Sequence, residues 1–192
     1  MKSKLIILFL LISYLCISQS IETLKSDCAT MYESTYNMEF EKILDYTHPK
    51  VFEIADRETM LTILDETFQN DQLRIRLVHP KTTFTFSEVK EIEGKKICVV
   101  EYPQAMRMIY ENPLSEEEKS SIEESLKTTM TSKKITFEKD RNAFYIDGKD
   151  IMIAVSEEAT QNKWKLINYD KNQPQLLNMI LGENVVKQLG LQ

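Results

Sequence analysis

The chain has 192 residues and a formal net charge of −6, from 24 basic and 30 acidic side chains. With 42% hydrophobic residues, four glycines and five prolines, it lacks the composition of a disordered or fibrous protein and favours one globular domain. Because it is acidic and has no cluster of lysine or arginine, nucleic acid and anionic membrane surfaces are excluded as expected partners.

The N-terminus has the pattern of an export signal. Lys2 and Lys4 precede an apolar run from Leu5 to Leu15, which is shorter than the roughly 20 apolar residues of a membrane-spanning helix. We expect a signal peptide at residues 1–18 and a single domain at residues 19–192, exported to the periplasm or the medium without a stable membrane anchor.

A lipoprotein is the alternative to a released protein, with Cys16 as the acylated residue. Lipoprotein signals have a small residue before this cysteine, whereas the chain has the bulky Leu15. Cleavage after Ser18 instead places two small side chains, Ser18 and Cys16, at the positions that signal peptidase recognises. The sequence therefore favours release over lipidation.

Three helices are predicted at the start of the domain. Apolar side chains recur at helical spacing over residues 21–36, 39–46 and 58–69. Asp56 is placed to cap the third helix. Residues 51–54 are long enough for one brief strand between the second and third helices.

The pattern changes to alternation after the third helix, which predicts strands. Glu93-Gly94-Lys95 and Asp147-Gly148 are expected to form hairpin turns, and Pro103 predicts a bend or a sheet edge. The predicted strands are residues 73–77, 83–92, 96–111, 135–137, 144–146, 151–155 and 163–169.

Two further helices are expected, one near residues 115–131 and one at the C-terminus over residues 175–188. Ser115 followed by three glutamates is a typical helix start. The order of elements predicts an α+β fold, in which N-terminal helices pack on a curved antiparallel sheet.

These elements resemble the nuclear-transport-factor-2-like superfamily, which includes ketosteroid isomerases, scytalone dehydratases and polyketide cyclases. The resemblance rests on Asn37-Met38-Glu39-Phe40 and the residues up to Pro49, on Asp56-Arg57-Glu58-Thr59-Met60, and on residues 162–169 with Trp164. It is one of pattern, without a catalytic signature. It implies a cone-shaped sheet, a cystatin-like roll, and a homodimer formed through the open sheet face.

The resemblance covers roughly residues 21–111 and 133–170, so the helix near 115–131 and the C-terminal helix are departures from the family. The family's isomerases carry a general base near the end of the first strand. The matching stretch here places Ile54 at that position, with Glu53 and Asp56 on either side.

Aromatic side chains and one arginine are the best candidates for a ligand site. In a cone they would line an apolar cavity with a few polar groups, although the same side chains could simply fill the core. Met106, Met108 and Met130 would add adaptable lining or adaptable packing. The candidate ligand-binding residues are Tyr36, Tyr102, Arg107, Tyr110 and Trp164.

Cys28 and Cys98 form either a disulfide or two buried free thiols, since both lie in apolar segments of an exported chain. His48 and His79 lie where one element ends and the next begins, and we interpret them as turn residues rather than a catalytic pair. No spacing of these four residues is typical of a metal site, and no cofactor motif is present.

The sequence thus favours an exported, non-catalytic domain that binds a hydrophobic small molecule or acts as a scaffold. One alternative is a small-molecule isomerase, lyase or hydrolase that uses Glu53 or Asp56 with a tyrosine such as Tyr36. A second alternative is a protein-interaction module with a filled core.

Overall fold

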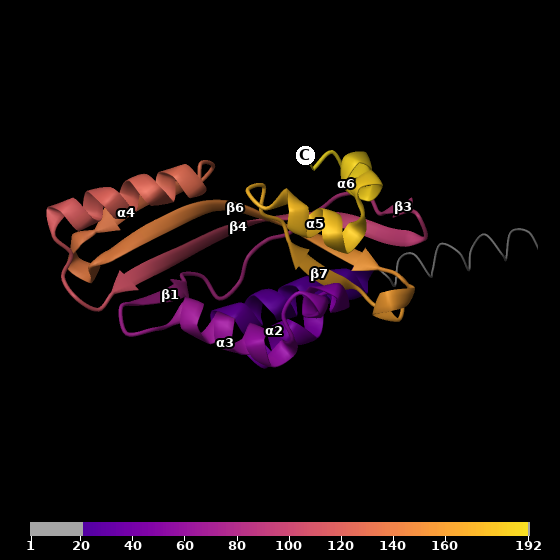
Figure 1. Ribbon diagram of the computed structural model, residues 1–192, viewed down its shortest axis with the longest axis horizontal. Coiled ribbons are helices and arrows are strands. Elements are labelled where there is room, and N and C mark those ends of the chain that lie inside the picture. The colour runs from indigo at the N-terminus through magenta and orange to yellow at the C-terminus, as the bar shows by residue number, and fades with distance from the viewer. Residues whose placement is uncertain (1–20, 192) are drawn as a thin grey trace, which may run out of the picture.

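The computed structural model describes residues 21–191, and the signal peptide predicted at residues 1–18 lies outside them. The described chain has an α+β fold with a seven-stranded antiparallel sheet, as predicted (Figure 1). The helices are an N-terminal helix at residues 21–36, α2 (Phe40–Tyr46), α3 (Arg57–Phe68), α4 (Glu116–Thr129), α5 (Pro174–Leu181) and α6 (Glu183–Leu189). The strands are β1 (Leu73–Leu77), β2 (Thr85–Phe86), β3 (Lys90–Ile92), β4 (Lys95–Tyr110), β5 (Lys134–Glu138), β6 (Ala143–Ser156) and β7 (Lys165–Asn168).

The two longest strands, β4 and β6, form the centre of the sheet. They pair in antiparallel register from Lys96 opposite Ser156 to Ile109 opposite Ala143. The strand order is β1-β4-β6-β5, while β2 and β3 also pair with β4, and β7 pairs with β6. The two faces of this β4–β6 ribbon therefore carry the core.

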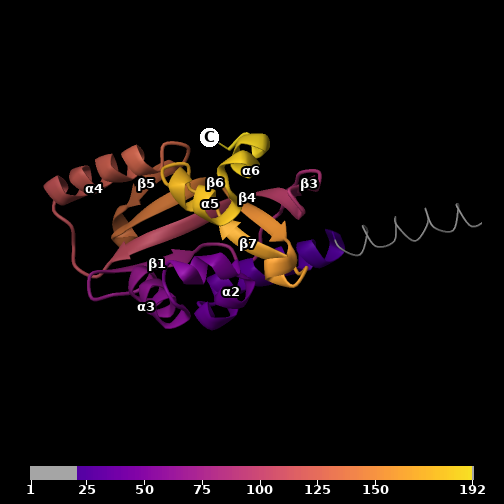
Figure 2. The same cartoon turned by 45° about the vertical axis from the view of Figure 1, so that its right-hand side comes forward.

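One face of the ribbon is covered by different helices at its two ends. Cys98 and Met152 lie in a buried cluster with Leu24 of the N-terminal helix, whereas Phe144 lies in a second cluster with Leu126 of α4. Because strands twist along their length, the same face turns from the N-terminal helices toward α4. The N-terminal helices and α4 therefore lie on opposite sides of the molecule in both views, although the same face of the twisted ribbon packs against both (Figure 1 and Figure 2).

The opposite face of the ribbon is covered by the C-terminal helices. Ile153 and Val155 of β6 are buried against Ile180 of α5 and against Val185 and Val186 of α6. The predicted single helix at residues 175–188 is wrong, because Gly182 separates α5 from α6 at a φ of 95°. Such a backbone conformation is easily adopted by glycine and ends the first helix.

Two helix starts predicted from sequence are confirmed. The Asp56 carboxylate accepts a hydrogen bond from the backbone N–H of Thr59 at 2.8 Å and caps α3. Ser115 and Glu118 form a reciprocal capping box at the start of α4.

The β3–β4 hairpin is also confirmed. Its two-residue turn, Glu93-Gly94, has φ values of 52° and 73°, which suit the twist of the flanking strands. Pro103 lies between the parts of β4 that pair with β2 and with β1, where that side of β4 has no strand partner. Its carbonyl accepts a hydrogen bond from the Thr82 hydroxyl at 2.6 Å, so the predicted local edge is confirmed.

The brief strand predicted at residues 51–54 is wrong. The segment is a 3-10 helix, Pro49–Glu53, with His48 as its cap. Proline at the first helical position is pre-organised for a helical turn, and this local effect decides the conformation.

The strand predicted over residues 83–92 is divided into β2 and β3. Between them, the backbone N–H of Val99 in β4 donates to the Ser87 hydroxyl at 2.9 Å. The hydroxyl of Ser87 therefore replaces a backbone carbonyl as the acceptor of one hydrogen bond between the strands.

The hairpin turn predicted at Asp147-Gly148 is wrong, because β6 continues through both residues. A Cβ atom on Gly148 would lie 2.8 Å from Cγ of Lys133. The glycine therefore makes room for the Lys133 side chain, which crosses the strand at this point.

Candidate functional site

The side chains predicted to line a ligand cavity do not meet at one place. Tyr102 and Trp164 are buried in the cluster under the N-terminal helix. The Tyr102 ring packs edge-on to Tyr32 at 6.0 Å between centroids. Tyr110 packs against Phe144 at the far end of the ribbon. These three predicted residues contribute to the packed core.

Arg107 and Tyr36 lie apart from those residues. The Arg107 Nε atom is 2.7 Å from a carboxylate oxygen of Glu138, and the guanidinium lies 5.3 Å from the centre of the Tyr145 ring. Tyr36 is exposed at the end of the N-terminal helix.

The acids of the catalytic alternative are Glu53 and Asp56. Glu53 is exposed at the end of the 3-10 helix. The backbone N–H of Thr59 donates to Asp56 and holds the pKa of that carboxyl below its ordinary value. A carboxylate stabilised in its charged form as a helix cap is poorly suited to accept a proton.

Cys28 and Cys98 are both buried and both free thiols, which is the second of the two alternatives drawn from the sequence. They belong to the same buried cluster. Burial raises the pKa of the Cys28 thiol to about 12. The Cys98 thiol donates weakly to the Ser87 carbonyl at 3.4 Å.

A buried polar network joins three segments that are distant in sequence. His48 Nε2 lies 3.0 Å from Oε1 of Glu157, and Lys95 Nζ lies 3.0 Å from Oε2 of the same carboxylate. The His48 side chain is fully buried. We assign the proton of the neutral ring to Nε2, because the backbone N–H of Lys50 donates to Nδ1 at 3.3 Å.

The charges of the network fit a structural role. Burial lowers the pKa of His48 and outweighs the opposing effect of Glu157, so the ring is held neutral. Burial alone would raise the pKa of Glu157, but Lys95 and His48 together hold it below its ordinary value. Both ring nitrogens and both carboxylate oxygens are engaged, so neither group is free to act on a substrate.

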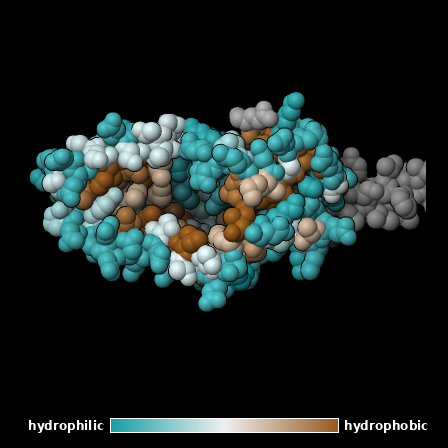
Figure 3. Space-filling view, in the orientation of Figure 1, coloured by the Kyte–Doolittle hydropathy of each residue, from teal (hydrophilic) through white to brown (hydrophobic). Residues whose placement is uncertain are grey.

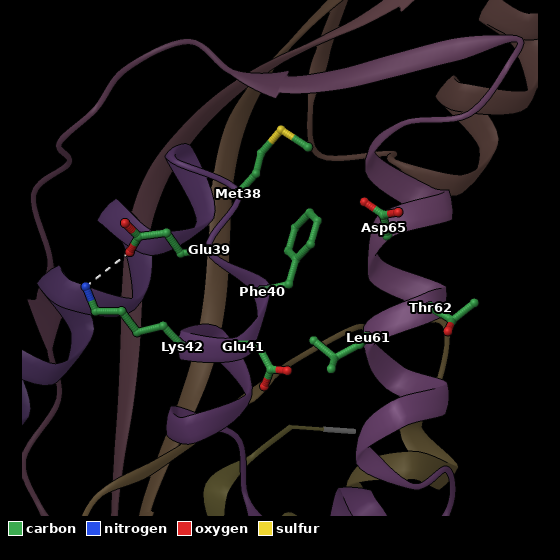
Figure 4. A pocket seen from close by; sticks show the side chains of 8 residues that line it. All are labelled: Met38, Glu39, Phe40, Glu41, Lys42, Leu61, Thr62 and Asp65. Carbon is green, nitrogen blue, oxygen red and sulfur yellow. Dashed lines mark hydrogen bonds and ion pairs between the residues drawn. The ribbon is translucent and has the colours of Figure 1, made fainter.

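A groove between α2 and α3 is the best candidate for a binding site. Its volume is about 710 Å³. Met38, Phe40 and Leu61 point into the space between the two helices, with Asp65 beside them (Figure 4). We call this the α2–α3 groove; its lining residues are Met38, Glu39, Phe40, Glu41, Lys42, Leu61, Thr62 and Asp65.

The two walls of the groove are held together at both ends. Arg57 at the start of α3 pairs with Glu41 at 2.9 Å and with Asp45 at 2.8 Å. The Phe40 and Phe68 rings are in contact with centroids 5.2 Å apart. No residue of α3 is fully buried, so its apolar side chains remain partly accessible.

The conformation of Met38 is unusual for a methionine. The backbone N–H of Met38 donates to the Thr35 carbonyl, and the N–H of Glu39 donates to the Ser34 carbonyl, the pattern of a Schellman motif. Met38 occupies the left-handed position, at φ 60°, where glycine is usual and asparagine occasional. The strained backbone directs a flexible apolar side chain into the groove.

Charged side chains surround the apolar wall. Glu39 pairs with Lys42 at 3.1 Å, and Glu41 pairs with Arg57. Among residues 21–191, the Asp65 carboxylate has no ion pair or hydrogen bond. The groove therefore presents one uncompensated negative charge.

A second hollow lies between α4 and α5 and is visible in the space-filling view (Figure 3). Its volume is about 440 Å³, and residues 129–133 and 169–173 form its sides. Lys133 crosses Gly148 and pairs with Asp150 at 2.6 Å. Because the charges of that pair satisfy each other, this hollow is a weaker candidate than the α2–α3 groove.

No protein-family model, curated protein or solved structure matches the chain. The resemblance to the nuclear-transport-factor-2-like superfamily and the homodimer that it implies therefore stay predictions. In residues 21–191 no helix is long and apolar enough to cross a membrane. The same residues contain no group of three histidine, cysteine or acidic side chains placed to hold a metal.

Proposed function

We propose that the protein is a non-catalytic binding domain that holds an apolar ligand in the α2–α3 groove. The observation that carries the proposal is Met38, an apolar side chain at a helix-end position that favours glycine. A strained backbone at a site wall is a common feature of functional positions. Phe40 and Leu61 complete the apolar lining.

The size and chemistry of the groove support this proposal. Its volume of about 710 Å³ falls within the roughly 300–1,000 Å³ typical of small-molecule sites. Methionine has three rotatable bonds and a polarisable sulfur, so it adapts to ligands of different shape.

Binding of a neutral solvatochromic dye, Nile red, tests the proposal. We expect saturable binding to the wild type and a loss of about three- to tenfold in affinity for Met38→Gly, since the variant removes apolar contact area. Met179→Ala is the matched control, because Met179 is an exposed methionine on α5, with 66% of its surface accessible. Equal dye affinity in wild type and Met38→Gly would show that the ligand lies elsewhere.

The same proposal includes export. Lys2, Lys4 and the apolar run up to Leu15 support it. N-terminal sequencing of the protein recovered from a secreting host should begin at Gln19. An acylated N-terminus at Cys16 would instead identify a lipoprotein.

A further inference from the structure

We infer that the ligand of the α2–α3 groove is a small amphiphilic cation, with its charged group on Asp65 and its apolar body along Met38 and Phe40. The inference rests on the proposed function and adds the chemical class of the ligand. Asp65 approaches the groove from α3, opposite Met38 and Phe40 (Figure 4).

The pairing of the lining charges carries the inference. Glu39 and Glu41 are each paired with a cation of the protein, at 3.1 Å and 2.9 Å, and the cation of Glu41 is Arg57, which also pairs with Asp45. In the described part of the chain, Asp65 has no such partner. A ligand ammonium or guanidinium would complete this pair, whereas an anionic ligand would meet three carboxylates and one lysine that is already paired.

The dimensions of the groove favour a small molecule over a helical segment of a protein. One wall is α2, which has seven residues and is about 10 Å long at about 1.5 Å per residue. A helical partner usually needs anchors over about two turns or more. The volume of about 710 Å³ is also that of a small-molecule site.

Three probes with the same eight-carbon chain test the charge preference: octylamine as its ammonium salt, 1-octanol and octanoate. We expect the wild type to bind octylammonium about two- to fivefold more tightly than 1-octanol at low salt, the range of an exposed ion pair, and octanoate most weakly. Added salt should reduce this preference. Binding is measured by NMR titration of backbone amides, with the largest shifts expected in α2 and α3.

Two isosteric variants locate the charge. Asp65→Asn should bind octylammonium no more tightly than 1-octanol. Its affinity for 1-octanol should equal that of the wild type. Glu66→Gln removes the same charge one residue along α3, outside the groove lining, and should keep the preference. If both variants reduce the preference equally, a general field of the acidic domain acts instead of Asp65.

The outcomes separate this inference from the proposed function. If 1-octanol binds the wild type as tightly as octylammonium and Met38→Gly weakens both, the binding groove stands and the cationic ligand does not. If no probe binds in a way that depends on Met38, both proposals fail. If a decapeptide of alternating leucine and lysine binds in the groove and octylammonium does not, the partner is a peptide and the small-molecule inference is wrong.

Discussion

Nε2 of His48 lies 3.0 Å from Oε1 of Glu157, although the two residues are 109 positions apart in the sequence. Lys95 approaches the other carboxylate oxygen. The three side chains join the segment after α2, the start of β4 and the end of β6. The hydrogen bond from the neutral His48 ring to Glu157 joins the segment after α2 to the sheet, and because His48 is titratable, the strength of this contact should depend on pH.

The first prediction concerns the free energy of unfolding between pH 7.5 and 5.5. Burial lowers the pKa of His48 in the folded protein, so the unfolded chain takes up a proton near pH 6.5 that the folded protein does not. Stability must therefore fall as the pH drops through this window, by up to about 1.4 kcal/mol from this group. His48→Gln should remove that part of the pH dependence in urea unfolding.

His79→Gln is the control for this measurement, because His79 is exposed and the variant should keep the wild-type pH dependence. Glu157 acts in a lower window. Its pKa is below the ordinary value in the folded protein, so its contribution is present above about pH 4.5 and is lost as the pH falls further. A His48 ring that titrates by NMR at or above pH 6.5 would contradict the account of the network.

The second prediction is that Glu157→Ala lowers the free energy of unfolding by about 3 kcal/mol or more, because it leaves the largely buried side chain of Lys95 without a counter-charge and the buried Nε2–H of His48 without an acceptor. Lys95 and Glu157 side chains are 16% and 10% exposed. Glu101→Ala breaks the exposed pair with Lys149 and should cost at most about 1 kcal/mol. Equal losses in the two variants, measured by urea unfolding, would show that the buried network adds nothing beyond a surface pair.

Local signals in the sequence predicted the parts of the fold that local chemistry decides. Asp56 and Ser115 mark the starts of α3 and α4, and Glu93-Gly94 marks a hairpin. The strand predicted at residues 51–54 was wrong because the local effect of Pro49 was overlooked, but the turn predicted at Asp147-Gly148 was wrong because a residue distant in the sequence determines the conformation there. Gly148 has the composition of a turn, but the side chain of Lys133 requires it within a continuous strand.

The candidate site was less accessible to sequence analysis than the fold. Glu157 and Lys95 are charged residues at strand ends, with no sequence signal that they are buried together. Asp65 is one of several acids on α3, and only the pairing of its neighbours distinguishes it. Met38 had no sequence signal either, because helices also end without a left-handed residue, as α2 and α3 do at Thr47 and Gln69.

The third prediction is that Gly148→Ala destabilises the protein by about 1–3 kcal/mol, the usual cost of overpacking. The new Cβ would lie 2.8 Å from Cγ and 3.2 Å from Cα of Lys133, so the contact cannot be relieved by movement of the lysine tip alone. In the Lys133→Gly background the same substitution should cost less, because the clashing Cγ is absent. If the losses in free energy of unfolding for Gly148→Ala and Lys133→Gly simply added in the double variant, the Lys133 side chain would not be the reason for glycine at position 148.

The fourth prediction concerns the thiols of protein that lacks residues 1–18, in which Cys28 and Cys98 are the remaining cysteines. Burial raises the pKa of Cys28 to about 12 and also raises the pKa of Cys98, and the thiolate is the reactive form. We expect almost no reaction with an aromatic disulfide reagent at pH 8 in buffer, and two thiols per chain in urea. No reactive thiol in urea would instead show that the two cysteines are bridged.

The fifth prediction separates stability from binding at Met38. Glycine relieves the strain of a φ of 60°, so Met38→Gly should raise the free energy of unfolding by about 0.5–1 kcal/mol even though it removes an apolar side chain. Met179→Gly places the same substitution inside α5 and should instead lower it by about 1 kcal/mol. Urea unfolding measures both. If Met38→Gly lowered the stability as Met179→Gly does, the methionine would be retained for packing between α2 and α3. A more stable variant that binds Nile red more weakly than the wild type would show that the strained methionine is retained for the ligand.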